Sequence, residues 1–174
     1  MSSSFSWKSI WKIKVPLRVA FFSWNAALGK ILTIDNLRLR KVLVLDWCYM
    51  CKRVGETVDH LLSFTSSLCL HLRDVVFCVL FGVFWVMPSR VIDLLACWRG
   101  GFAWKMLSVI WNAVPLCVRW MLRWERNCRD FEDSERSSVE LKMIFVRPLC
   151  DWMDALSGHS FSYALDFVDL CFPC

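Results

Sequence analysis

The sequence lacks the short motifs that carry the chemistry of several large enzyme classes. It contains no Gly-x-x-x-x-Gly-Lys phosphate-binding loop and no Gly-x-Ser-x-Gly turn that presents a nucleophilic serine. No Cys/His dyad stands out among its ten cysteines and three histidines. Internal repeats and low-complexity segments are missing as well. We therefore expect a protein that is not an enzyme.

A long uninterrupted apolar run is also missing. The charge-free stretch Val75–Met87 has 13 residues, whereas a membrane-spanning helix needs about 20. The segment Trp104–Leu122 is nearly long enough, but it contains Lys105, Pro115 and Arg119. Both stretches are more typical of buried core helices, so we expect no membrane span.

No secretory leader is visible at the N-terminus, where Met1 is followed by three serines and then by Trp7, Lys8 and Lys12. A leader would need a short apolar core before a small-residue cleavage site. We expect an intracellular protein, nuclear or cytoplasmic. In a reducing compartment most of the ten cysteines would be small buried hydrophobic residues rather than disulfides.

Hydrophobic residues make up 57% of the 174 residues, which excludes a disordered chain and fits one domain or a small domain with an added helical part. The charge is unevenly placed. Residues 1–58 hold ten Lys and Arg against three Asp and Glu, a charge of +7, whereas residues 59–174 hold eleven against thirteen, a charge of −2. The basic first third indicates an anionic partner such as nucleic acid, or simply a solvated surface.

The first third predicts short elements. Pro16 suits the first turn of a helix that ends near Gly29, and Thr33 can cap a second short helix over Ile34–Lys41. The segment Val42–Trp47, which includes the β-branched residues Val42 and Val44, predicts a strand that leads into a cysteine pair.

The last third predicts two longer helices. The first runs from Trp104 to about Cys128, and the second starts at the capping box Ser137–Glu140 and continues to about Leu156. Pro115 and Pro148 are expected kinks. We therefore predict a mainly α protein, with a small zinc-binding-like loop/β element around the cysteine pair, followed by a helical C-terminal part.

The cysteine pair could carry chemistry. Cys48 and Cys51 have the two-residue gap that lets two thiolates reach one ion from a single turn, and His60 follows Cys51 after eight intervening residues. Two thiolates and an imidazole form a good donor set for zinc. On these residues alone, a pair of buried cysteines or a redox pair remains an alternative.

The order of these motifs resembles the zinc-binding domain at the C-terminal end of plant non-LTR (LINE-type) retrotransposon reverse transcriptases. The resemblance covers about residues 5–65. In chain order it consists of WKSIWKIKVPLRVAFFSW at 7–24, TIDNL at 33–37, Cys48, Cys51, Glu56 and DHLL at 59–62. It implies zinc as the metal and Glu56 as a residue that orients a ligand, unless Glu56 lies in a surface loop.

The resemblance also implies a fourth ligand, a cysteine five residues after His60. Here that position is Thr65, which is not a usual zinc ligand. Cys69 lies nine residues after His60 and would face away from it on a continuous helix. Because structural zinc sites normally close with four protein ligands, we expect an impaired site, with a three-ligand site of Cys48, Cys51 and His60 plus water as the alternative.

The resemblance implies a zinc-binding-like domain over residues 5–72 and a helical extension over 73–174. The resembling enzymes carry their catalytic Asp-Asp core in an upstream domain, and this chain has no Asp-Asp pair. We expect a non-catalytic module that is associated with RNA or DNA, or with other retroelement protein regions. The alternative is a structural or protein-interaction remnant that binds neither metal nor nucleic acid. The expected phosphate contacts are Lys30, Arg38, Arg40, Lys41, Lys52 and Arg53.

Overall fold

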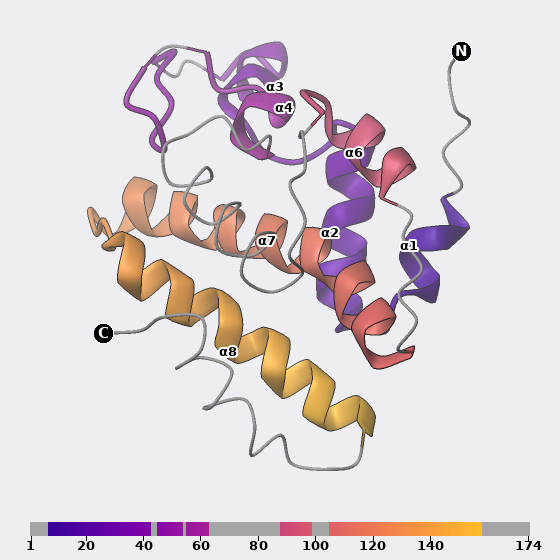
Figure 1. The fold of residues 1–174 in the computed structure, drawn as a ribbon. Coiled ribbons are helices and arrows are strands. Elements are labelled where there is room, and N and C mark those ends of the chain that lie inside the picture. Colours follow the sequence, from indigo (N-terminus) through magenta and orange to yellow (C-terminus); the bar gives the residue numbers. More distant parts are fainter. Residues whose placement is uncertain (1–6, 43–44, 54, 63–87, 99–104, 158–174) are drawn as a thin grey trace.

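The computed structural model describes residues 7–42, 45–53, 55–62, 88–98 and 105–157. Within these residues the protein is mainly helical, as predicted (Figure 1). The helices are α1 (Lys8–Lys12), α2 (Leu17–Ala27), α3 (Ile34–Leu39), α4 (Val58–Leu62), α6 (Val91–Cys97), α7 (Lys105–Phe131) and α8 (Ser138–Ser157).

Helix α7 is the centre of the fold. Helix α8 packs along one side of it, and α2 and α4 pack against it as well (Figure 1). The completely buried side chains of α7 include Leu116 and Leu122, and α8 contributes Phe145 and Val146 to the same cluster. This single hydrophobic cluster includes residues from both the first third and the last third of the chain.

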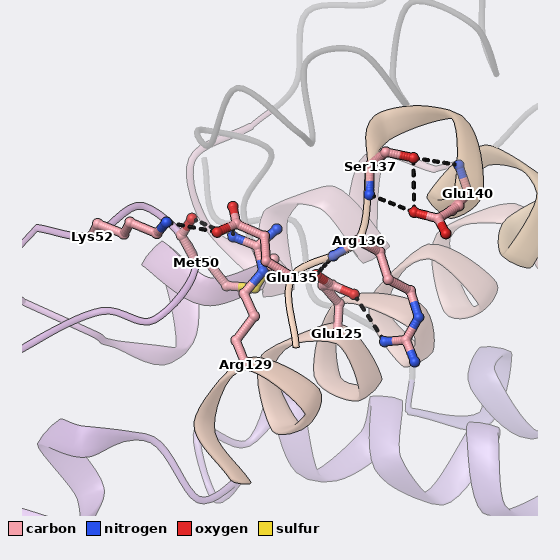
Figure 2. Close-up of polar contacts among 8 residues, drawn as sticks. All are labelled: Met50, Lys52, Glu125, Arg129, Glu135, Arg136, Ser137 and Glu140. Atoms are coloured by element: carbon pink, nitrogen blue, oxygen red, sulfur yellow. Dashed lines mark hydrogen bonds and ion pairs between the residues drawn. The ribbon is translucent and has the colours of Figure 1, made fainter. Parts of the chain in front are cut away.

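The two long helices match their predicted ranges, and each runs unbroken through its proline, Pro115 in α7 and Pro148 in α8. The capping box at the start of α8 is confirmed. The Glu140 amide donates to Ser137 Oγ at 3.3 Å, and the Ser137 amide donates to Glu140 Oε2 at 2.8 Å (Figure 2). No described helix has the length and apolar character that would let it cross a membrane.

The N-terminal helices agree with the sequence pattern in part. Helix α2 begins after Pro16, and Gly29 follows it with a φ of +68°, a conformation that glycine adopts without a Cβ clash. Thr33 precedes α3 as predicted, but its hydroxyl donates to the Asp35 carboxylate instead of accepting from the helix. The cap comes from Glu56, whose Oε1 accepts from the Ile34 amide at 3.3 Å.

The predicted strand over Val42–Trp47 is wrong for the residues of that range that the structure describes, which form no strand. Leu45 and Trp47 are exposed, and the described part of the chain offers them no neighbouring strand with which to pair. Among the described residues, β pairing is limited to a single antiparallel bridge between Cys48 and Arg53.

Candidate metal centre

A tight turn brings the two cysteines together. The Cys48 amide donates to the Arg53 carbonyl at 2.6 Å, and the Lys52 amide donates to the Cys48 carbonyl at 2.8 Å. Lys52 adopts a φ of +57°, in the left-handed region that reverses the chain direction after Cys51. This turn over residues 48–53, the cysteine turn, therefore places the Cys51 thiol beside the Cys48 thiol without a regular strand.

His60 reaches the same point from α4. The Thr57 hydroxyl accepts a hydrogen bond from the His60 amide at 3.0 Å, as a helix N-cap does, and this fixes the first turn of α4. The His60 Nε2 atom then lies 3.1 Å from Cys51 Sγ. The ligand atoms of Cys48, Cys51 and His60 all lie within 4.8 Å of one another.

This geometry fits zinc. Zinc–sulfur bonds of about 2.3 Å and zinc–nitrogen bonds of about 2.0–2.1 Å place tetrahedral ligands roughly 3.5–3.8 Å apart. The observed separations need only small side-chain shifts to reach those values. Thr65 and Cys69, the residues considered for a fourth ligand, lie outside the described residues.

Cys48 is completely buried, whereas Cys51 and His60 are half-buried. Burial raises the pKa of the Cys48 thiol to about 11, an effect that hydrogen bonds from the Cys51 and Met50 amides partly oppose. Because zinc binds the thiolate, the ion would have to displace this proton, and its own charge favours the displacement.

Glu56 does not lie in a surface loop, and it contacts groups other than the three candidate ligands. Its side chain is completely buried, and Oε1 accepts from the Ile34 amide and from Arg126 Nη2 at 3.2 Å. Burial raises the pKa of the Glu56 carboxyl above its ordinary value, and the Arg126 charge opposes that rise. Glu56 therefore joins the start of α3 to α7.

The six expected phosphate contacts are all exposed. Two of them already form ion pairs, Arg38 with Asp46 at 3.0 Å and Lys52 with Glu135 at 2.6 Å. Within the described part of the chain, no ion-pair partner is found for Lys30, Arg40, Lys41 or Arg53. Among the described residues, two cations of the set are therefore paired with a carboxylate and four are not.

A network of charged residues at the end of α7 contacts the cysteine turn, and the sequence pattern did not predict it. Figure 2 shows Arg129 and Glu135 meeting Met50 and Lys52. Its only local signals in the sequence are the spacings of four between Glu125 and Arg129 and between Arg126 and Asp130, which place each pair on one face of a helix.

No curated protein and no solved structure matches the chain. Residues 2–70, which include the cysteine turn and His60, match the protein family described as zinc-binding in reverse transcriptase. That match and the Cys/Cys/His geometry together support a reverse transcriptase zinc-binding domain in the first part of this chain.

Proposed function

We propose that residues 5–72 act as a non-catalytic zinc-binding module of retrotransposon origin, which associates with RNA or DNA, and that residues 73–174 are its helical extension. The observation that carries the proposal is the convergence of Cys48, Cys51 and His60 within the region that matches the family. When bound, zinc would cross-link the cysteine turn to α4 and stabilise both.

The zinc proposal is tested by thermal unfolding of the full chain with and without equimolar zinc. Zinc is expected to raise the unfolding temperature of the wild type and to leave that of His60→Gln unchanged. The control is His159→Gln, which alters a histidine that is not one of the three proposed ligands. Equal zinc effects on the wild type and His60→Gln would contradict the proposal.

The proposed site is impaired because Thr65 stands where the family places a cysteine. Thr65→Cys is expected to complete a Cys₃His set and to raise zinc affinity, as measured by competition with a coloured chelator. Cys69→Ser is expected to leave zinc affinity unchanged. Loss of zinc binding in Cys69→Ser would identify Cys69 as the true fourth ligand.

Nucleic-acid association rests on the exposed cations of the first third. Arg40 and Lys41 follow α3, and Arg53 closes the cysteine turn. Removal of each phosphate-binding charge should reduce the slope of log affinity against log salt concentration by about 0.7–0.9. Fluorescence anisotropy with labelled RNA and DNA oligonucleotides should show weaker binding for Arg40→Gln/Lys41→Gln and unchanged binding for Arg147→Gln, an exposed change on α8.

The second candidate function is that of a structural or protein-interaction remnant that binds neither metal nor nucleic acid. One observation favours it. Leu39, which directly precedes Arg40, is 80% exposed, and Leu45 is 85% exposed, so both offer apolar surface to a protein partner. Other regions of a retroelement protein are the expected partners. Salt-independent or undetectable oligonucleotide binding would favour this candidate. A protein-dependent product in a primer-extension assay would contradict both candidates, because neither includes catalysis.

A further inference from the structure

The cysteine turn is contacted by Arg129, which lies 79 positions after Met50 in the chain. Arg129, near the C-terminal end of α7, donates from Nη1 to the Met50 carbonyl at 3.2 Å (Figure 2). Met50 lies between Cys48 and Cys51, so its carbonyl belongs to the peptide unit that enters Cys51. The position of this carbonyl therefore affects where the Cys51 thiol points.

The Arg129 guanidinium is itself fixed. Its Nε donates to Glu125 Oε1 at 2.7 Å, and its Nη1 lies 3.1 Å from Glu135 Oε1. The Arg129 side chain is 9% exposed, and Glu125 is completely buried. A buried carboxylate and a second acceptor leave the guanidinium little freedom, so the hydrogen bond to Met50 has a defined direction.

A second contact holds the other side of Cys51. Lys52 follows Cys51 directly, and its Nζ lies 2.6 Å from Glu135 Oε2. Glu135 thus contacts both Arg129 and Lys52, through different oxygen atoms. The end of α7 and the turn that leads into α8 therefore hold the chain immediately before and immediately after Cys51.

We infer that Arg129 is a positioning residue for the metal site: through the Met50 carbonyl it holds the Cys48–Cys51 turn in the geometry that zinc needs. This inference rests on the proposed zinc function. The α7–α8 pair then acts on a site to which it contributes no ligand among the described residues. Such preorganisation raises affinity because less ordering is left to occur when the metal binds.

The test compares Arg129→Gln with Arg123→Gln in the full chain. Arg123 is a matched control because it also lies on α7 but contacts the Phe22 and Trp120 rings instead of the turn. Removal of a group that orients a metal ligand typically reduces affinity about 10–100-fold. We expect that reduction in zinc affinity for Arg129→Gln and a change of less than about twofold for Arg123→Gln.

Two further readouts separate positioning from general stability. The visible absorption bands of the cobalt-substituted protein report ligand geometry and should change in Arg129→Gln but not in Arg123→Gln. Arg129→Lys keeps a donor but loses the planar fork, so it should bind zinc with intermediate affinity. Glu135→Gln, a half-exposed change that should leave the fold intact, should lower zinc affinity in the same direction but less.

Hydrogen exchange of the metal-free chain keeps this inference separate from the zinc proposal. The Cys48 and Lys52 amides, both bonded within the turn, should exchange faster in Arg129→Gln than in Arg123→Gln. If these amides exchange faster in Arg129→Gln but the wild type binds no zinc, the zinc proposal and the role of Arg129 in metal binding are both overturned. Arg129 would then make only a structural contact. The inference itself would be overturned if Arg129→Gln folded and matched the wild type in zinc affinity, in the cobalt spectrum and in the exchange rates of these amides.

Discussion

Helices α7 and α8 pack through apolar side chains, whereas polar contacts attach the cysteine turn to the end of α7. The buried residues of these helices include Leu122 of α7 and Phe145 of α8, which belong to one hydrophobic cluster. At the turn, Arg129 and Glu135 contact the backbone carbonyl of Met50 and the side chain of Lys52. Hydrogen bonds depend on direction as well as distance, so they can hold the turn in the defined geometry that a metal site requires.

The largest loss of stability is expected when the packing of the α7–α8 pair is disrupted. Phe145→Ala removes a side chain that is 1% exposed, so the free energy of unfolding should fall by about 3–5 kcal/mol. Denaturant titration with and without zinc should give the same loss, because Phe145 lies in α8 and is not a candidate ligand. A loss below about 1 kcal/mol would show that the packing between α7 and α8 is not the main source of stability.

The second largest loss of stability is expected at the buried ion pair that joins α7 to the start of α3. Arg126→Met leaves the Glu56 carboxylate buried without its charged partner, and a loss of about 3 kcal/mol in the free energy of unfolding is expected. Arg126→Met/Glu56→Gln should recover part of this loss, because the Glu56 position then no longer carries a buried charge. Additive losses in a double-mutant cycle would mean that the two side chains act independently.

The smallest effect is expected at the exposed end of the network. The hydrogen bond from Lys52, and then the charge of Arg129, lower the pKa of Glu135 from its ordinary value of 4.5. A carboxyl group with a lowered folded-state pKa stabilises the fold above its unfolded pKa, and this contribution is lost as the pH falls through the folded-state value. Because the Glu135 side chain is 50% exposed, Glu135→Gln should cost no more than about 1 kcal/mol at pH 7.

Denaturant titrations of the wild type and Glu135→Gln between pH 7 and pH 3 check this expectation. The difference between their unfolding free energies should be constant near neutrality and should shrink as the pH falls below about 4. A difference that grows on acidification would show that the ion pairs of Glu135 are not its source.

The parts that sequence predicts well are those with a local pattern. The capping box Ser137–Glu140 predicted where α8 begins, and the two-residue gap between Cys48 and Cys51 predicted the turn. The described residues of Val42–Trp47 do not form the predicted strand, because strand-favouring residues need a partner strand and the described part of the chain offers none.

The contacts that hold the cysteine turn could not be predicted in the same way. Arg129 and Met50 are 79 residues apart, and Arg126 and Glu56 are 70 apart. Single charges at such separations have no periodic signal, so only the three-dimensional fold pairs them. The same is true of the cap of α3, where Glu56 takes the role predicted for Thr33.

The measurement that tests the central claim most directly is zinc K-edge X-ray absorption on the zinc-loaded full chain. With Cys48, Cys51 and His60 as ligands, the spectrum should show two sulfur atoms at about 2.3 Å and the remaining nitrogen or oxygen donors at about 2.0–2.1 Å. In Cys51→Ser the sulfur count should fall to one. Three sulfur atoms in the wild type would contradict the impaired site. A spectrum without any sulfur ligand would contradict the metal centre itself.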